Sequence, residues 1–198
     1  MKRNPLLVFS LTLACLLTLY SFSVMALGSP AANSSTDLVP WPAPMPIGGE
    51  KVTLEEFKSA LSLDDFRIPE YLPSKVGLVE IRLKPKISIA DLIFSMSKVK
   101  DEATIDDVVS TGGMILIVHI SPMNNDEAAI NNIIEHNIKD TKYVQRITVN
   151  GAIGAGVGEG VHNGVHTHGQ IQWWRDGVHY DLIADLPLEE LTKIAESM

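Results

Sequence analysis

Hydrophobic and polar positions alternate or repeat at helical spacing through most of residues 53–198. Val79, Ile81 and Leu83 alternate with charged residues, which predicts a strand with one face in the core. Residues 89–97, 114–121 and 143–149 predict three further strands. Between them, isoleucines recur on one helical face from Asp126 to about Lys139, so this segment is predicted to be a helix that packs against the sheet.

The ends of this patterned region carry clear local signals. Thr53 with Glu56 forms a capping box, which predicts a short helix to about Leu61. Asp176-Gly177 stands between two alternating runs, and both turn residues tolerate positive φ, so residues 170–175 and 178–183 are predicted to pair as a hairpin. Residues 188–198 predict a closing helix. The elements together indicate an α+β fold: an antiparallel sheet of about six strands with helices packed on one face.

The N-terminus carries an export signal. Lys2 and Arg3 precede an apolar run over residues 6–26, which ends in the small residue Ala26. We expect a signal peptide over residues 1–26, cleaved after Ala26; the alternative is an uncleaved signal anchor, because the run is long enough to span a bilayer. Residues 27–50 form a proline-rich linker, and residues 51–198 a single α+β domain. The expected location is extracytoplasmic, either secreted or tethered to the surface.

Charge and cysteine content exclude several classes of function. Cleavage after Ala26 leaves 14 basic and 24 acidic side chains, a net charge of −10. Such a surface repels the phosphates of nucleic acid and the anionic face of a membrane. The only membrane contact that we expect is through an uncleaved N-terminal segment. Cys15 lies in the leader and is the only cysteine, so the mature domain has no disulfide, thiolate nucleophile or cysteine-ligated metal.

A glycine-rich segment at residues 151–160 is predicted to be a loop. Its spacing does not complete a phosphate-binding motif, so no nucleotide is expected there. Glu159, His162, His166 and His168 follow closely, and in an extended chain His166 and His168 point to one face, as a divalent metal requires. The alternative is that these are solvated histidines that contribute little to stability. Because ordering ligands among glycines is entropically costly, the sequence favours no metal cofactor.

Three aromatic residues are candidates for contact with a ligand. Trp173 and Trp174 are adjacent, so in a strand one faces the core and the other faces away. The second tryptophan, with Tyr180, either contacts a ligand or covers the sheet face. No catalytic motif is present.

Several motifs resemble an uncharacterised family of exported domains, found in bacterial and archaeal surface proteins and outside anti-sigma factors. The motifs are Phe66-Arg67-Ile68-Pro69, Tyr71-Leu72-Pro73, Val149-Asn150-Gly151, the run from Trp174 to Tyr180, Leu188-Glu189-Glu190-Leu191 and Ile194-Ala195-Glu196-Ser197. The resemblance implies an open antiparallel half-barrel, similar to lipoprotein carriers and to the periplasmic regulator RseB. It implies a non-catalytic binding or sensor module for a lipid-like or peptide ligand, or for a cell-envelope protein. The alternative is a metal-binding accessory protein or hydrolase built on residues 159–168.

Overall fold

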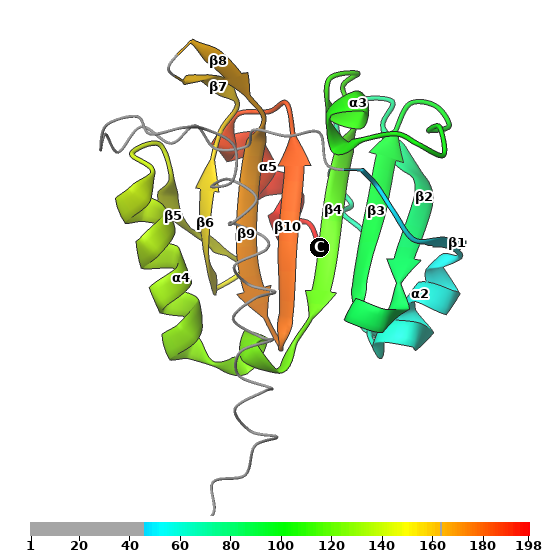
Figure 1. Cartoon of the computed structure of the whole chain (residues 1–198), viewed down its shortest axis with the longest axis horizontal. Coiled ribbons are helices and arrows are strands. Elements are labelled where there is room, and N and C mark those ends of the chain that lie inside the picture. The colour runs from blue at the N-terminus through cyan, green and yellow to red at the C-terminus, as the bar shows by residue number, and fades with distance from the viewer. Residues whose placement is uncertain (1–45, 163) are drawn as a thin grey trace, which may run out of the picture.

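An eight-stranded antiparallel sheet forms the centre of the computed structural model, which describes residues 46–162 and 164–198 (Figure 1). In order across the sheet, the strands are β1 (Glu50–Val52), β2 (Gly77–Lys84), β3 (Ile89–Ser95), β4 (Met114–Ile120), β10 (Val178–Ala184), β9 (Gly169–Arg175), β6 (Ala152–Val157) and β5 (Gln145–Val149). The sheet is open, with β1 and β5 at its edges. The α+β class is therefore confirmed, with eight strands in the sheet instead of six.

The glycine-rich segment accounts for part of the difference. Residues 152–157 are not a loop but strand β6, which pairs with β5 and β9. A Cβ at Gly154 would lie 2.3 Å from the carbonyl oxygen of Gln172, so this strand approaches β9 as only glycine allows. Beyond it, β7 (Gly160–His162) and β8 (Val165–Thr167) form a separate hairpin that projects from one end of the sheet (Figure 1).

Helices cover both faces of the sheet, where one face was predicted. On the face that we call the α5 face, α2 (Leu54–Leu61) and α5 (Leu188–Glu196) pack on the largest core cluster. On the opposite side, the α4 face, α3 (Ile105–Val109) and α4 (Glu127–Asp140) each pack on a smaller cluster. Two-sided burial explains why the sheet contains long uninterrupted apolar runs such as that of β4.

The local signals of the sequence are confirmed. Thr53 caps α2 with both hydrogen bonds of the capping box. Strands β9 and β10 pair in the predicted register, from Val178 opposite Arg175 to Ala184 opposite Gly169. The turn residues Asp176 and Gly177 have φ of 53° and 77°, as the hairpin requires.

Arg82 departs from the predicted alternation, because it is buried although its neighbours in the pattern suggest an exposed position. Its guanidinium donates to the carbonyl oxygens of Ile47 at 2.8 Å, Asp101 at 2.7 Å and Lys100 at 3.0 Å. Glu80 pairs with the same guanidinium. The side chain therefore ties two connecting segments to β2.

The folded unit begins before residue 51. Ile47 is buried against the core of the α4 face, and its amide donates to the carbonyl oxygen of Ala103 at 3.1 Å. The predicted leader at residues 1–26 and the linker up to residue 45 lie outside the described residues. Within the part of the chain that is described, no helix is long and apolar enough to cross a membrane.

Candidate metal site: an acid–histidine cluster at one end of the sheet

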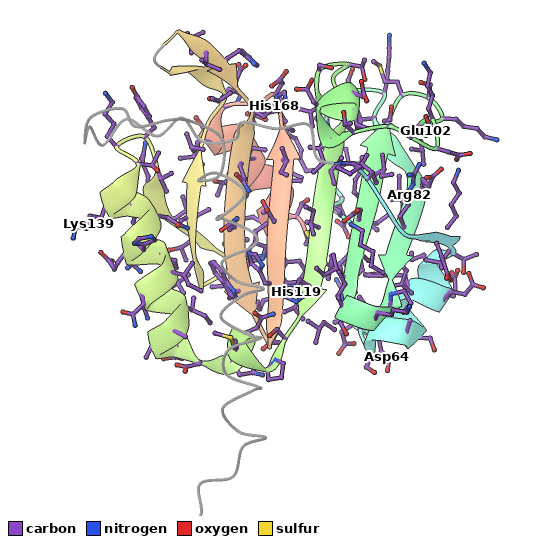
Figure 2. All side chains as sticks on the ribbon, in the orientation of Figure 1. Asp64, Arg82, Glu102, His119, Lys139 and His168 are labelled. Atoms are coloured by element: carbon purple, nitrogen blue, oxygen red, sulfur yellow. The ribbon has the colours of Figure 1, made fainter. Side chains whose placement is uncertain are left out.

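Two histidines and three carboxylates gather beside the β7–β8 hairpin, and we call them the acid–histidine cluster. Figure 2 labels His168 at this end of the molecule. The members are Glu159, which precedes β7; His166, in β8; His168, which precedes β9; Asp185, which follows β10; and Asp106, in the first turn of α3. Because β9 and β10 are antiparallel, the residue before β9 and the residue after β10 come together at this end.

His168 stands between two carboxylates. Its Nδ1 lies 2.6 Å from Oδ1 of Asp185, and its Nε2 lies 2.8 Å from Oδ1 of Asp106. The side chain is 10% exposed, which is low for a residue predicted to lie in a solvated loop. Burial by itself lowers the pKa of His168, but the hydrogen bonds to Asp185 and Asp106 outweigh it and raise that pKa. Both ring nitrogens then donate, and the charged imidazolium connects α3 to the end of β10.

His166 lies on the open side of the same cluster. Its Nε2 is 3.8 Å from Oε2 of Glu159 and 4.0 Å from Oδ1 of Asp185. One ligand atom from each of His166, His168 and Asp185 lies within 4.8 Å of the other two. The sequence prediction that His166 and His168 share a face agrees with their ring centroids, which are 5.8 Å apart.

The side chains of the cluster are of the types that bind divalent transition metals. Neutral imidazole and carboxylate are zinc ligands, with bonds of about 2.0–2.2 Å in a tetrahedral arrangement. The Nδ1 atom of His168 faces the other donors, while its Nε2 faces Asp106. Asp106 would therefore orient the imidazole from behind, as carboxylates commonly do for histidine ligands. Glu159, which is 41% exposed, is placed to supply a further oxygen.

The sequence identified only part of the cluster. Glu159, His166 and His168 come together, whereas the side chain of His162 lies outside what the structure describes. Asp185 and Asp106 were missed. The hairpin register places residue 185 opposite residue 168, so Asp185 was within reach of sequence reasoning. Asp106 was not, because its position depends on how α3 packs.

The three aromatic candidates lie in the core. Trp173 and Tyr180 are 1% and 4% exposed on the α5 face, where their rings stack with centroids 4.9 Å apart. Trp174 is 8% exposed and packs below α4 on the other face, where it stacks on His179 with centroids 4.4 Å apart. The structure does not bring Trp174 and Tyr180 together.

Comparison with known proteins places the chain in a family. Residues 95–198, slightly more than half of the sequence, match the model of a domain of unknown function, DUF4367. The chain belongs to this family. No curated protein and no solved structure matches it significantly. The DUF4367 match runs from the last residue of β3 to the C-terminus, so it includes every member of the acid–histidine cluster. The prediction of an uncharacterised family is confirmed.

Proposed function

We propose that this DUF4367 protein is a non-catalytic extracytoplasmic binding module whose ligand is a divalent transition metal ion of the zinc class. The observation that carries the proposal is the convergence of ligand atoms from His166, His168 and Asp185 within 4.8 Å of one another. Glu159 completes the donor set, and Asp106 orients His168.

The strand structure around the cluster favours metal binding more than the sequence did. The sequence predicted a high entropic cost of metal binding because it placed the ligands in a glycine-rich loop. Instead, His166 is in β8, and His168 and Asp185 flank the paired ends of β9 and β10. Donors fixed by a hydrogen-bonded ladder lose less conformational freedom when a metal binds.

A lipid-like or peptide ligand has less support. Trp173, Trp174 and Tyr180 were the residues offered for it, and all three are buried in core clusters. The mouth of a half-barrel would be the α5 face, which α2 and α5 already cover. The similarity to lipoprotein carriers and RseB remains a proposal, and a cell-envelope protein remains the proposed partner class. The N-terminal export pattern supports the extracytoplasmic location.

Thermal unfolding with and without zinc tests the proposal. A metal that binds only the folded state raises the melting temperature, and the increase grows with metal concentration. We expect an increase at pH 7.5 that diminishes as the pH falls, because protons compete with the metal for the imidazoles. Since the pKa of His168 is raised by Asp185 and Asp106, this loss should begin above the ordinary histidine value of about 6.5.

Three variants make this test specific. The double change His166→Ala with His168→Ala removes the zinc response. His136→Ala, which removes an exposed imidazole on α4, retains it. Asp106→Asn weakens zinc binding by about 10- to 100-fold, because it removes the orienting carboxylate. A wild-type melting temperature that zinc leaves unchanged at pH 7.5 would contradict the proposed function.

A further inference from the structure

A cavity of about 680 Å³ lies beside α3, where this helix meets the segment that connects it to β3. We call it the α3 cavity, and its lining residues lie between Ser95 and Thr111. In Figure 2, Glu102, which lines the cavity, and His168 of the acid–histidine cluster are labelled on opposite sides of α3. The volume is typical of a small-molecule site, and the cavity is separate from the proposed metal site.

The wall of the α3 cavity is held in place by the protein itself. The buried guanidinium of Arg82 donates to the carbonyl oxygens of Asp101 at 2.7 Å and Lys100 at 3.0 Å. The amide of Ala103 donates to the same carbonyl oxygen of Lys100 at 3.2 Å. Because the backbone of the wall is already fixed, a ligand that binds there has little chain to order, which lowers the entropic cost of binding.

Two of the three carboxylates that line the α3 cavity are engaged within the protein. Asp101 pairs with Nζ of Lys51 at 2.6 Å. Oδ2 of Asp107 accepts from the amide and from the hydroxyl of Thr104, both at 2.8 Å. Glu102 is the remaining acid, and its side chain is exposed. The negative charge of the cavity is therefore largely compensated by contacts outside it.

The basic side chains of the α3 cavity are not engaged in this way. Lys98 and Lys100 line it, and neither forms a salt bridge with any residue that the structure describes. Ser95 and Ser97 line the same wall, and the Ser95 hydroxyl oxygen accepts from the Ser97 amide at 3.4 Å, which leaves its O–H group to donate. The unused hydrogen-bond donors of the cavity are thus suited to an anion.

The buried part of the cavity lining is apolar. Ala103 and Val108 are 6% and 2% exposed, and Val99 is half-buried beside them in the same core cluster. An inorganic anion would leave this surface in contact with water. An acid with a hydrocarbon body would cover it and gain free energy from its burial.

We propose that the α3 cavity binds a small organic acid, which goes beyond the proposed metal function and does not depend on it. The carboxylate accepts from the ammonium groups of Lys98 and Lys100, and the hydrocarbon body packs on the apolar lining. Glu102 repels a second negative charge, so a monocarboxylate is favoured over a multiply charged anion such as phosphate.

Titration of the full, metal-free chain with hexanoate at pH 7.5 tests the proposal, with amide chemical shifts measured by NMR. We expect residues 97–103 and 111–113 to shift, while the β9–β10 turn at Gly177 does not. Hexanamide has the same body without the charge, and it should bind about 10-fold more weakly or worse, because the charge-assisted hydrogen bonds are lost. Inorganic phosphate should bind more weakly than hexanoate, because it has no apolar body.

Two double variants show which lysines bind the acid. Lys98→Gln with Lys100→Gln should weaken hexanoate binding about 10-fold and leave the binding of hexanamide unchanged. Lys75→Gln with Lys86→Gln removes the same charge from exposed positions outside the cavity and should change neither. The proposal is overturned if hexanoate leaves the cavity amides unshifted, if hexanamide binds as tightly as hexanoate, or if both double variants weaken binding equally. Because no metal is present, none of these results bears on the proposed metal function.

Discussion

Nδ1 of His168 and Oδ1 of Asp185 lie 2.6 Å apart, one before β9 and the other after β10. This contact predicts a specific pH dependence of folding. The pKa of His168 is raised in the folded protein, so the folded state holds its proton above the ordinary value of about 6.5. The stabilisation is fully present below that value, and it is lost as pH rises through the raised pKa of the folded state.

His168→Gln tests this dependence by urea unfolding at a series of pH values without metal. We expect a loss of about 1–3 kcal/mol at pH 6, because charge-assisted hydrogen bonds are removed, and a smaller loss at pH 9. Asp185→Asn should reproduce most of the effect. A loss that grows with pH would be the opposite of this expectation. The sequence suggested that changing these histidines leaves stability almost untouched; the burial of His168 between carboxylates predicts otherwise.

Gly154→Ala is expected to destabilise the domain by about 3 kcal/mol or more, as overpacking against rigid backbone does. The new Cβ would lie 2.3 Å from the carbonyl oxygen of Gln172 and 3.1 Å from Cβ of Trp173. Gly77→Ala is the matched control, because a Cβ there meets nothing within 4 Å. Chemical denaturation measures both. Equal stability of the two variants would show that β6 does not approach β9 as closely as described.

Arg82→Met is expected to lower the free energy of unfolding by about 3 kcal/mol, because it leaves the carbonyl oxygens of Ile47, Lys100 and Asp101 without their donor. Arg82→Lys keeps the charge but cannot reach all three oxygens at once, so it should recover only part of the loss. Urea denaturation of both variants distinguishes this role from that of a surface charge, which lysine would replace fully.

Asp181→Asn is expected to stabilise the protein above pH 7. The pKa of Asp181 is about 7 when folded and about 3.9 when unfolded, so ionisation reduces stability as pH rises from about 4 to 7. Removing that charge should gain about 2–4 kcal/mol at pH 8 and little at pH 4. Asp107→Asn should instead be destabilising at pH 8, because the hydrogen bonds from Thr104 hold the pKa of Asp107 below its ordinary value in the folded protein. A stabilising Asp107→Asn with a neutral Asp181→Asn would contradict this account.

The sequence was most informative where one local interaction decides the structure. Thr53 and Glu56 cap each other, and the turn at Asp176 and Gly177 sets the whole β9–β10 register. Sequence patterns failed where the deciding contact is distant. Gly154 is part of a strand because β9 lies against it, and Arg82 is buried because two remote segments offer carbonyl oxygens.

The same contrast applies to the candidate site: local patterns predict some of its residues, and distant packing decides the others. His166 and His168 are two residues apart, so their shared face follows from the extended backbone. Asp185 reaches His168 through a hairpin register that the sequence already contains. Asp106 lies 62 positions before His168, and only the packing of α3 brings it there. By composition alone, this segment of histidines and glycines resembles a solvated loop, but in the structure it lies in and beside paired strands.

Strand β10 lies in the middle of the sheet but is the last strand along the chain. Before it is added, β1 to β4 can form one ribbon and β5, β6 and β9 another, each with an unpaired inner edge. A polypeptide that is synthesised from its N-terminus therefore exposes the unpaired edges of β4 and β9 until residues 178–184 have been made. Unpaired strand edges can pair with other chains. Assembly should be slow, because it waits on pairing between segments distant in sequence, and sensitive to chaperones that shield β4 and β9 in the interval.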